Sequence, residues 1–266
     1  MPYRYETHMH TCQGSACGKS TGAEQARFYK GLGYAGIFIT DHFFGGNTAV
    51  PRDLPWKERI DRFCAGYEDA LQEGRKIGLD VFFGWEQNFE GDEYLIYGLD
   101  KAFLLDHPDI EHWTRKKQYD EVRAAGGAVI QAHPFRDRDY IRFIHLGLKY
   151  CDGIEVANTA NRVYNDVSAR RYARRYALLT IAGSDNHNCA LADPAKMMGV
   201  ALDAPLSSGR DFARLIRAGG ALRPIIPPGW FDADLSGAPH LPSYWVDDEQ
   251  SDYRRVPTNI DFLAES

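Results

Sequence analysis

Two histidines separated by one residue, His8 and His10, stand near the start of the chain in the stretch YETHMHT. Alternate side chains of an extended strand share one face, so both imidazoles are expected to project together from the end of a first strand. Two neutral imidazoles on one face are the beginning of a metal site. Because an HxH pair also occurs by chance in many proteins, the rest of the chain must supply the other ligands.

Further polar residues follow the other predicted strands or lie in them: Asp41, His42, Glu86, His133, Glu155, Asp185 and His187. In a parallel α/β barrel the carboxyl ends of all strands open on one face, where active sites are built. Residues that are remote in the sequence are therefore expected to converge there. The remaining histidines lie in predicted helical or tail segments and are interpreted as surface residues: His107, His112, His145 and His240.

The ligand types indicate which ions the site would take. Mixed imidazole and carboxylate ligands suit Zn, Mn or Fe better than Ca or Mg, and they are too many for one tetrahedral ion, so two or three divalent ions are expected. Clustered metals are typical of attack on phosphorus, since one ion generates a hydroxide near neutral pH and both hold charge on the phosphoryl oxygens. Related barrel sites hydrolyse amides or amidines, which leaves that chemistry as a second interpretation.

Short apolar stretches of strand length alternate with helical patterns along the chain. Strands are predicted at residues 3–8, 35–40, 79–84, 128–132, 153–157 and 178–183, with a hairpin at FEGDEYLIYG. Helices are predicted after Thr21, which forms a capping box with Glu24, and at residues 56–76, 111–125, 138–150, 163–177 and 207–218. Strands that are nearly all followed by helices describe a parallel sheet, either closed as a barrel or open and doubly wound.

The composition changes at residue 224, where a segment rich in Pro, Gly and aromatic residues begins. This segment is too short for a core of its own. We therefore predict one domain, with a barrel over residues 1–223 and an irregular tail or lid over residues 224–266.

The charge and the hydropathy of the chain limit the classes of partner and the cellular location that we expect. The chain of 266 residues has 31 basic and 37 acidic residues, which argues against a general nucleic-acid binder. It has no apolar run near the roughly 18 residues needed to span a membrane and no signal-peptide stretch, so no membrane attachment and a cytoplasmic location are expected. The five scattered cysteines lack the spacing of a disulfide framework; Cys17, near the histidine pair, is either a reduced loop cysteine or a soft metal ligand.

Six short motifs follow one another along the chain: HMHT, ITDH, GWE, QAHPFR, GIEVANT and GSDNH. In this combination they resemble the PHP family, the polymerase and histidinol phosphatase domains, over residues 3–200. The resemblance implies an α/β fold, a distorted (β/α)7 TIM-like barrel, with two or three metal ions at the strand ends. It also implies hydrolysis of phosphoesters by a metal-bridging hydroxide.

The resemblance assigns roles residue by residue. One ion would be held by His8, His10, Glu86 and Asp185. Glu86 would bridge to a second ion that His133 also binds, and His42 and His187 would serve another ion. Asp185 or His187 would also act in proton transfer as catalytic residues. Glu155 lies in the family's following strand and either supports the site or supports a loop.

Two departures from the family pattern concern the third metal position. A further Asp or His usually follows the HxH pair, but here the loop offers Ser15 and Cys17. Another histidine often follows the glutamate, but here the hairpin offers Asp92 and Glu93. The protein therefore uses two ions, or it recruits a replacement ligand such as Cys17 or Asp92.

Arginines that follow two motifs are candidates for substrate binding. Arg136 follows HPF and Arg162 follows NTAN, where a guanidinium could bind phosphate in a bidentate manner; Lys19 is a further candidate. The leading hypothesis is a small-molecule phosphatase of the histidinol-phosphatase type, with a small phosphoester as its partner. The alternatives are a nuclease or phosphodiesterase that acts on oligonucleotides, and a non-catalytic metal-binding regulatory domain. The substrate and the oligomeric state are not readable from the sequence.

Overall fold

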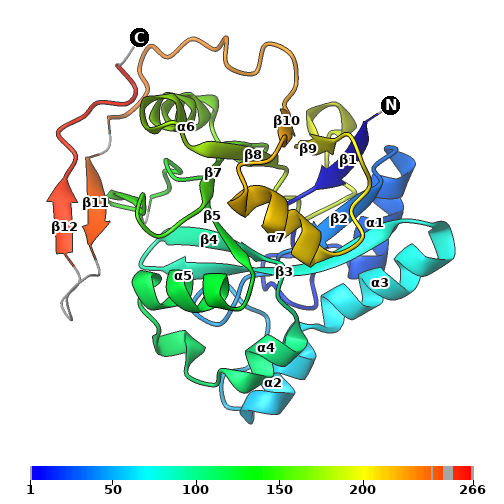
Figure 1. Ribbon diagram of the computed structural model, residues 1–266. Coiled ribbons are helices and arrows are strands. Elements are labelled where there is room, and N and C mark those ends of the chain that lie inside the picture. The colour runs from blue at the N-terminus through cyan, green and yellow to red at the C-terminus, as the bar shows by residue number, and fades with distance from the viewer. Residues whose placement is uncertain (1, 140, 241, 248–253, 265–266) are drawn as a thin grey trace.

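A curved sheet forms the centre of the molecule in the computed structural model, which describes residues 2–139, 141–240, 242–247 and 254–264. Within these residues its strand order is β10-β9-β1-β2-β3-β4-β5-β7-β8, and β8 lies against β9 and β10, so the sheet nearly closes into a barrel (Figure 1). The strands are β1 (Tyr3–Glu6), β2 (Gly36–Ile39), β3 (Asp80–Phe89), β4 (Asp92–Tyr97), β5 (Ala128–Ala132), β7 (Gly153–Asn158), β8 (Leu179–Gly183), β9 (Gly199–Leu202) and β10 (Arg223–Ile225). The predicted TIM-like barrel class is confirmed.

Strand directions explain why the barrel is distorted. β1, β2 and β3 pair in parallel, and so do β5, β7 and β8. Between these two groups β4 runs antiparallel to both β3 and β5, because the tight turn at Glu90 and Gly91 returns the chain at once. The predicted hairpin is thus confirmed, and it lengthens β3 so that Glu86 lies within this strand rather than after it.

The helices pack around the outside of the sheet (Figure 1). They are α1 (Gly22–Gly31), α2 (Trp56–Phe63), α3 (Ala65–Ile77), α4 (Lys101–Asp106), α5 (Arg115–Ala124), α6 (Val163–Tyr176) and α7 (Gly209–Arg217), with 3-10 turns η1 (Ile110–His112) and η2 (Pro194–Lys196). The capping box of Thr21 and Glu24 forms at the start of α1 as predicted. The helix predicted over residues 56–76 is two helices, which meet at Cys64.

The helix predicted over residues 138–150 is wrong. The described part of this segment contains instead the strand β6 (Ile144–Leu146). β6 pairs in parallel with β11 (Ser243–Asp247), and β11 pairs antiparallel with β12 (Arg254–Pro257), so a small second sheet forms beside the barrel (Figure 1). Because its partner strand lies far along the chain, no local pattern could reveal this pairing.

His145 lies in β6, and its interpretation as a surface histidine is also wrong. It is 5% exposed, and its Nδ1 lies 3.4 Å from Asp92 Oδ1. The strand turns this side chain toward the barrel, which a surface helix would not have done. β10 crosses the predicted boundary at residue 223 and pairs with β9, and the division into barrel and tail stays a prediction.

Aromatic side chains fill one end of the barrel. Tyr5, Phe38 and Tyr97 are fully buried there, and Phe212 of α7 packs on them with a ring-centroid distance of 4.6 Å to Phe38. These residues lie at the amino ends of the parallel strands, so the apolar core leaves the opposite end to polar residues. No helix among the described residues is long and apolar enough to cross a membrane.

Candidate metal centre

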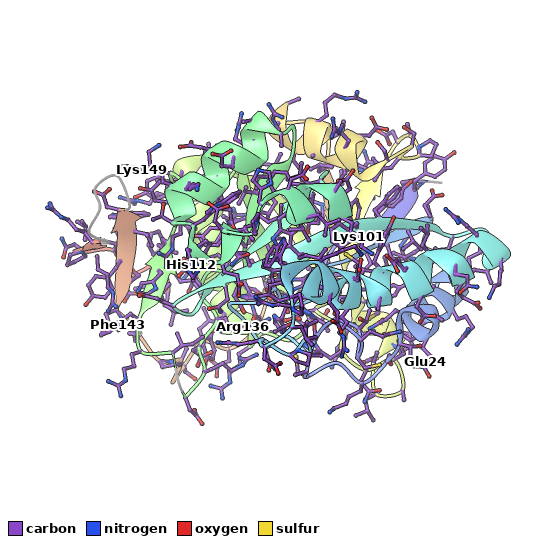
Figure 2. The ribbon with its side chains drawn as sticks, turned by 90° about the horizontal axis from the view of Figure 1, so that it is seen from below. Glu24, Lys101, His112, Arg136, Phe143 and Lys149 are labelled. Carbon is purple, nitrogen blue, oxygen red and sulfur yellow. The ribbon has the colours of Figure 1, made fainter. Side chains whose placement is uncertain are left out.

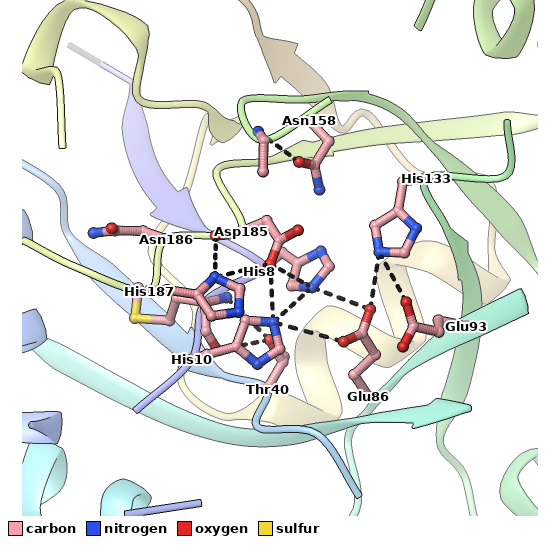
Figure 3. Close-up of polar contacts among 12 residues, drawn as sticks. His8, His10, Thr40, Glu86, Glu93, His133, Asn158, Asp185, Asn186 and His187 are labelled. Atoms are coloured by element: carbon pink, nitrogen blue, oxygen red, sulfur yellow. Dashed lines mark hydrogen bonds and ion pairs between the residues drawn. The ribbon is translucent and has the colours of Figure 1, made fainter. Parts of the chain in front are cut away.

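Histidines and carboxylates in or directly after β1, β2, β3, β4, β5 and β8 meet at the carboxyl end of the barrel (Figure 3). His8 and His10 follow β1, and their Nε2 atoms lie 3.2 Å apart. Asp185 follows β8, and its Oδ1 lies 3.0 Å from His10 Nε2. All three side chains are almost completely buried. The structure thus brings together residues that are remote in the sequence, as expected from their positions at the ends of parallel strands.

Glu86 of β3 lies in the middle of this group (Figure 3). Its Oε1 lies 3.3 Å from His8 Nε2 and 3.0 Å from His133 Nε2. Its Oε2 lies 2.7 Å from His42 Nδ1. His10 Nε2 also lies 3.6 Å from Oε2. One carboxylate therefore contacts four imidazoles, which follow β1, β2 and β5.

His187 completes the group on its more open side. The imidazole rings of His42 and His187 both stack against His10, with centroid distances of 4.1 and 4.3 Å, and their own centroids lie 5.9 Å apart. His187 Nδ1 lies 2.7 Å from the Asp185 carbonyl oxygen, which can only accept, so Nδ1 carries the proton and Nε2 keeps its lone pair. The His187 side chain is 27% exposed, whereas those of His8 and His10 are fully buried.

Glu155 of β7 supports the group from behind. Its Oε1 accepts a 2.9 Å hydrogen bond from His8 Nδ1, and its Oε2 accepts from the backbone N–H of His133 and from Asn158 Nδ2. This carboxylate fixes the ring of His8 with Nε2 directed at the group. Of the two readings of Glu155, support of the site fits its contacts.

Asp41 and Ser15 support His10 in the same way. Asp41 accepts hydrogen bonds from the Thr11 backbone, the Thr11 hydroxyl and the Ser15 hydroxyl. The Ser15 oxygen in turn lies 3.1 Å from His10 Nδ1. Asp41 thus holds the loop after β1 rather than joining the histidines, although it also follows a strand.

The two acidic residues of the hairpin point in opposite directions, because neighbouring side chains of a strand alternate. Asp92 forms a buried ion pair with Arg115, whose Nη2 lies 2.6 Å from Asp92 Oδ1. Glu93 faces the site instead: its Oε2 lies 3.6 Å from His133 Nε2, and its Oε1 lies 3.8 Å from His42 Nδ1. Sequence reasoning named Glu93 only as one acidic residue of the hairpin; its register opposite Ala132, beside His133, is the signal that distinguishes it.

The candidate substrate-binding arginines differ in their positions. Arg136 lies on the loop-covered side of the barrel (Figure 2), and its Nη2 binds Asp185 Oδ2 at 2.6 Å. Arg162 is 65% exposed and pairs with Asp137, 3.1 Å away. Lys19 is exposed. The structure thus brings only Arg136 into contact with the histidine and carboxylate group.

Electrostatics keep the carboxylates charged. Burial alone would raise the pKa of Glu86, but His8 and His42 hold it well below its usual range. Burial likewise opposes ionisation of Asp185, but Arg136 and His8 hold its pKa well below the usual range. For His10, burial lowers the pKa well below its usual value, and His42 and His187 add to this effect. Charged Glu86 and Asp185 and a neutral His10 are the protonation states that metal binding requires. Burial opposes protonation of His8 and His42, but Glu155 and Glu86 raise their respective pKa values well above the usual value, so these two imidazoles would release a proton when an ion binds.

Cys17 lies beside this group in the loop after β1. Burial raises the pKa of its thiol, but hydrogen bonds with His187 and His42 lower it to about 6. A free cysteine titrates near 8.5, so this thiol has unusual thiolate character.

Three polar atoms at the centre of the site are buried without a hydrogen bond among the described residues. They are Glu86 Oε2, Asp185 Oδ1 and His42 Nδ1. Glu86 Oε2 and His42 Nδ1 are close to each other but not in hydrogen-bond geometry. Leaving such atoms unpaired costs about 1–3 kcal/mol each, which a bound cation would offset.

Strained backbone conformations at two residues also indicate a functional site. His133 and Asp185 adopt left-handed backbone angles, with φ of 27° and 51°, although neither is glycine. Such conformations cost roughly 1–3 kcal/mol and concentrate at functional sites.

The residues present therefore fit divalent metal ions. Four overlapping sets of three side chains could each hold an ion: His8, His10 and Asp185; His8, Glu86 and His133; His42, Glu86 and Glu93; and His10, His42 and His187. The shared members mean that ions bound here would share ligands, as in clustered metal sites.

Comparison with solved structures agrees with the barrel. A protein from Bifidobacterium adolescentis that is inferred to be a metal-dependent phosphoesterase is similar at 17% identity and a TM-score of 0.52, over 83% of this chain and 98% of that one. A two-domain protein of Bacteroides vulgatus, containing a predicted PHP-like metal-dependent phosphoesterase, is similar at 17% identity and a TM-score of 0.59, over 82% and 63% of the two chains. PsfC from Pseudomonas syringae is similar at 16% identity and a TM-score of 0.54, over 86% and 93%.

At these identities the likeness establishes the fold. No family model matches the sequence, and neither does any curated protein.

Proposed function

We propose that this protein is a metal-dependent phosphoesterase of the PHP family that hydrolyses a small-molecule phosphomonoester, as histidinol phosphatases do. The observation that carries the proposal is the convergence of five histidines and three carboxylates, with unpaired buried oxygens of Glu86 and Asp185 at their centre. The fold similarity to proteins that are themselves inferred or predicted to be metal-dependent phosphoesterases supports it.

We assign the candidate ligands to separate ions on the two sides of Glu86. His8, His10 and Asp185 would hold one ion with Glu86. His133 would hold a second ion, with Glu86 shared and Glu93 in place of the family's second histidine. A third ion would lie by His42 and His187. Imidazole and carboxylate donors favour Zn, Mn or Fe.

When bound, such ions supply a nucleophile at neutral pH and neutralise charge on the phosphoryl oxygens. The residues around them set the geometry. Arg136 holds Asp185 ionised through its 2.6 Å contact, and Glu155 fixes the ring of His8. His187 is the most exposed imidazole of the group, so it and Asp185 are the proposed proton carriers where a substrate enters.

The substrate is proposed to be small and anionic. Arg136 is the guanidinium closest to the group, and it is our candidate for contact with the phosphate in place of Arg162. The net charge of −6 disfavours a long nucleic acid. The five free cysteines support a reducing compartment, and we propose a cytoplasmic location.

The test compares hydrolysis of p-nitrophenyl phosphate, bis-p-nitrophenyl phosphate and a single-stranded oligonucleotide by the wild type and by Glu86→Gln. We expect turnover of the monoester by the wild type and a loss of about 100-fold or more in the variant, because Gln removes the shared charge. Circular dichroism of the variant should match that of the wild type.

Unchanged turnover in Glu86→Gln would contradict the proposal. Preference for the oligonucleotide, with a steep fall in added salt, would assign a nuclease instead. Metal binding without hydrolysis of any of the three esters would favour a regulatory domain.

A further inference from the structure

Three side chains fix the guanidinium of Arg136 in one orientation. Its Nε donates to Asn161 Oδ1 at 2.8 Å, and its Nη2 donates to Asn158 Oδ1 at 3.0 Å and to Asp185 Oδ2 at 2.6 Å. Nη1 makes no hydrogen bond among the described residues, and 11% of the side chain is exposed. Nη1 is therefore the group that remains available to an incoming phosphate oxygen.

The two asparagines that hold Arg136 are themselves held by the buried carboxylate of Asp166, in α6. Asn161 Nδ2 donates to Asp166 Oδ1 at 2.7 Å, and the backbone N–H of Asn158 donates to Asp166 Oδ2 at 3.2 Å. A carboxylate only accepts and a guanidinium only donates, so the Asn161 amide must turn its Nδ2 to Asp166 and its Oδ1 to Arg136. Asp166 thus determines which end of this amide meets the guanidinium.

The third donor to Asp166 comes from the segment over residues 224–266. Trp230, which lies 64 residues further along the chain, donates from Nε1 to Asp166 Oδ2 at 2.8 Å. Its ring is half-buried against the main hydrophobic core. All the partners that Asp166 has among the described residues are donors, so both carboxylate oxygens must accept. A contact from this segment is therefore linked to Arg136 through one carboxylate and one amide.

We propose that Trp230 and Asp166 are positioning residues for Arg136, a role that rests on the proposed function. The indole N–H holds the carboxylate, and the carboxylate orients the Asn161 amide. The amide oxygen then holds Nε of Arg136, so that Nη2 binds Asp185 while Nη1 stays directed at the phosphate. A guanidinium that is already fixed loses less conformational freedom on binding, so the gain is affinity for phosphate.

Trp230→Phe separates this role from simple packing, because it removes the indole N–H and keeps an aromatic ring. Trp245 of β11 offers the matched control. Its ring packs on Tyr172 and Tyr176, with centroid distances of 6.1 and 5.3 Å, and its Nε1 makes no hydrogen bond among the described residues. Trp245→Phe therefore removes the same atoms from the same segment without loss of a hydrogen bond.

The experiment uses the full chain loaded with Mn²⁺. Calorimetry gives the Kd for inorganic phosphate, and hydrolysis of p-nitrophenyl phosphate gives kcat and KM. Trp230→Phe should raise Kd and KM about five-fold and leave kcat within about two-fold, because a contact made equally in the ground and transition states is weakened. Trp245→Phe should match the wild type.

Two further variants test the path of the effect. Asp166→Asn should raise Kd at least as much as Trp230→Phe, because its NH₂ group would face a donor and release the Asn161 amide. Arg136→Lys keeps a positive charge near Asp185 but has no Nε for Asn161 to hold. Adding Trp230→Phe to Arg136→Lys should therefore change Kd no further.

An unchanged Kd in Trp230→Phe, an equal loss in Trp245→Phe, or a loss that persists in full on the Arg136→Lys background would each overturn the inference. The proposed phosphoesterase could still stand in those cases. If the wild type binds phosphate but hydrolyses no ester, the proposed function fails, and the Kd values still decide the positioning role. If the wild type binds no phosphate, both fail together.

Discussion

Three of the imidazoles at the centre, those of His8, His10 and His187, are each fixed from behind by an acceptor or a hydroxyl. Glu155 binds His8 Nδ1, the Ser15 hydroxyl contacts His10 Nδ1, and the Asp185 carbonyl accepts from His187 Nδ1. Such contacts determine which nitrogen keeps its lone pair and hold the ring in place. The arrangement leaves Nε2 of all three rings available to a cation.

Replacement of Glu155 by Gln tests this orientation. One oxygen becomes an NH₂ group, so either the contact with His8 or the hydrogen bonds from the His133 N–H and Asn158 Nδ2 are lost. We expect metal affinity to fall about 10- to 100-fold with the stoichiometry retained, measured by competition with a chromophoric chelator. Glu58→Gln, on the exposed side of α2, is the matched control.

Equal affinities for Glu155→Gln and the control would contradict a positioning role for Glu155.

At the residue scale the sequence predicted most of the group. His8, His10, His42, His133 and His187 were found because parallel strands bring their carboxyl ends together. Glu93 was not assigned, because its direction depends on a strand register that no single segment reveals. The position of Arg162 could not be predicted for a related reason, since the pairing of its guanidinium with Asp137 depends on how two loops pack.

At the scale of elements, the hairpin of β3 and β4 sets the register of the site. Glu86 pairs opposite Leu95, and Glu93 opposite Ala132, so both glutamates point toward the barrel mouth. Asp92, one residue before Glu93, points the other way into a buried cluster with Arg115 and Tyr94. The ion pair of Asp92 therefore anchors the strand that presents Glu93.

Replacement of Asp92 by Asn should destabilise the fold by about 3 kcal/mol at neutral pH, because it removes the charge that faces a buried guanidinium. Burial opposes ionisation of Asp92, but Arg115 lowers its pKa below the ordinary 3.8. A lowered folded-state pKa means that the ionised carboxylate stabilises the protein above pH 3.8 and that this contribution is lost as the pH falls through the lower value.

The deficit of Asp92→Asn should therefore be the same at pH 7 and pH 5 and should shrink below pH 4. Urea unfolding at these pH values measures it, with the exposed substitution Asp120→Asn as the control. A deficit that grows on acidification would contradict the assigned role.

Elements were predictable where the pattern is local. The capping box of α1 and the hairpin turn are signals within a few residues, and both form. The helix over residues 138–150 failed because β6 is stabilised by pairing with β11, which lies about one hundred residues later. The burial of His145 could not be predicted for the same reason, because it depends on this pairing between segments far apart in the sequence.

At the scale of the whole molecule, the two ends of the barrel have different roles: one end holds an apolar core, and the other holds the candidate metal centre. Tyr5, Phe38 and Phe212 fill the amino end with apolar contacts, while the carboxyl end gathers buried charged and polar groups. The candidate ligands lie in β3 and β4 and after the ends of β1, β2, β5 and β8, so ions bound here would together connect most of the sheet.

Metal removal should therefore lower the stability of the entire fold. An ion that binds only the native state adds about 3 kcal/mol at a free concentration roughly 100 times its dissociation constant. We expect a chelator to lower the Tm of the wild type by several degrees and to leave the Tm of Glu86→Gln nearly unchanged, as measured by calorimetry. The same Tm for the wild type with and without the chelator would contradict a metal centre that spans the sheet.

The central claim, a metal-dependent phosphoesterase, is tested most directly by metal content measured together with activity. Protein purified without added metal is analysed for bound elements, and hydrolysis of p-nitrophenyl phosphate is followed before chelation, after chelation and after return of the ion. We predict two or three equivalents of Zn, Mn or Fe per chain and hydrolysis that is lost and then restored. Protein that holds no metal, or hydrolysis that survives complete removal of the metal, would contradict the claim.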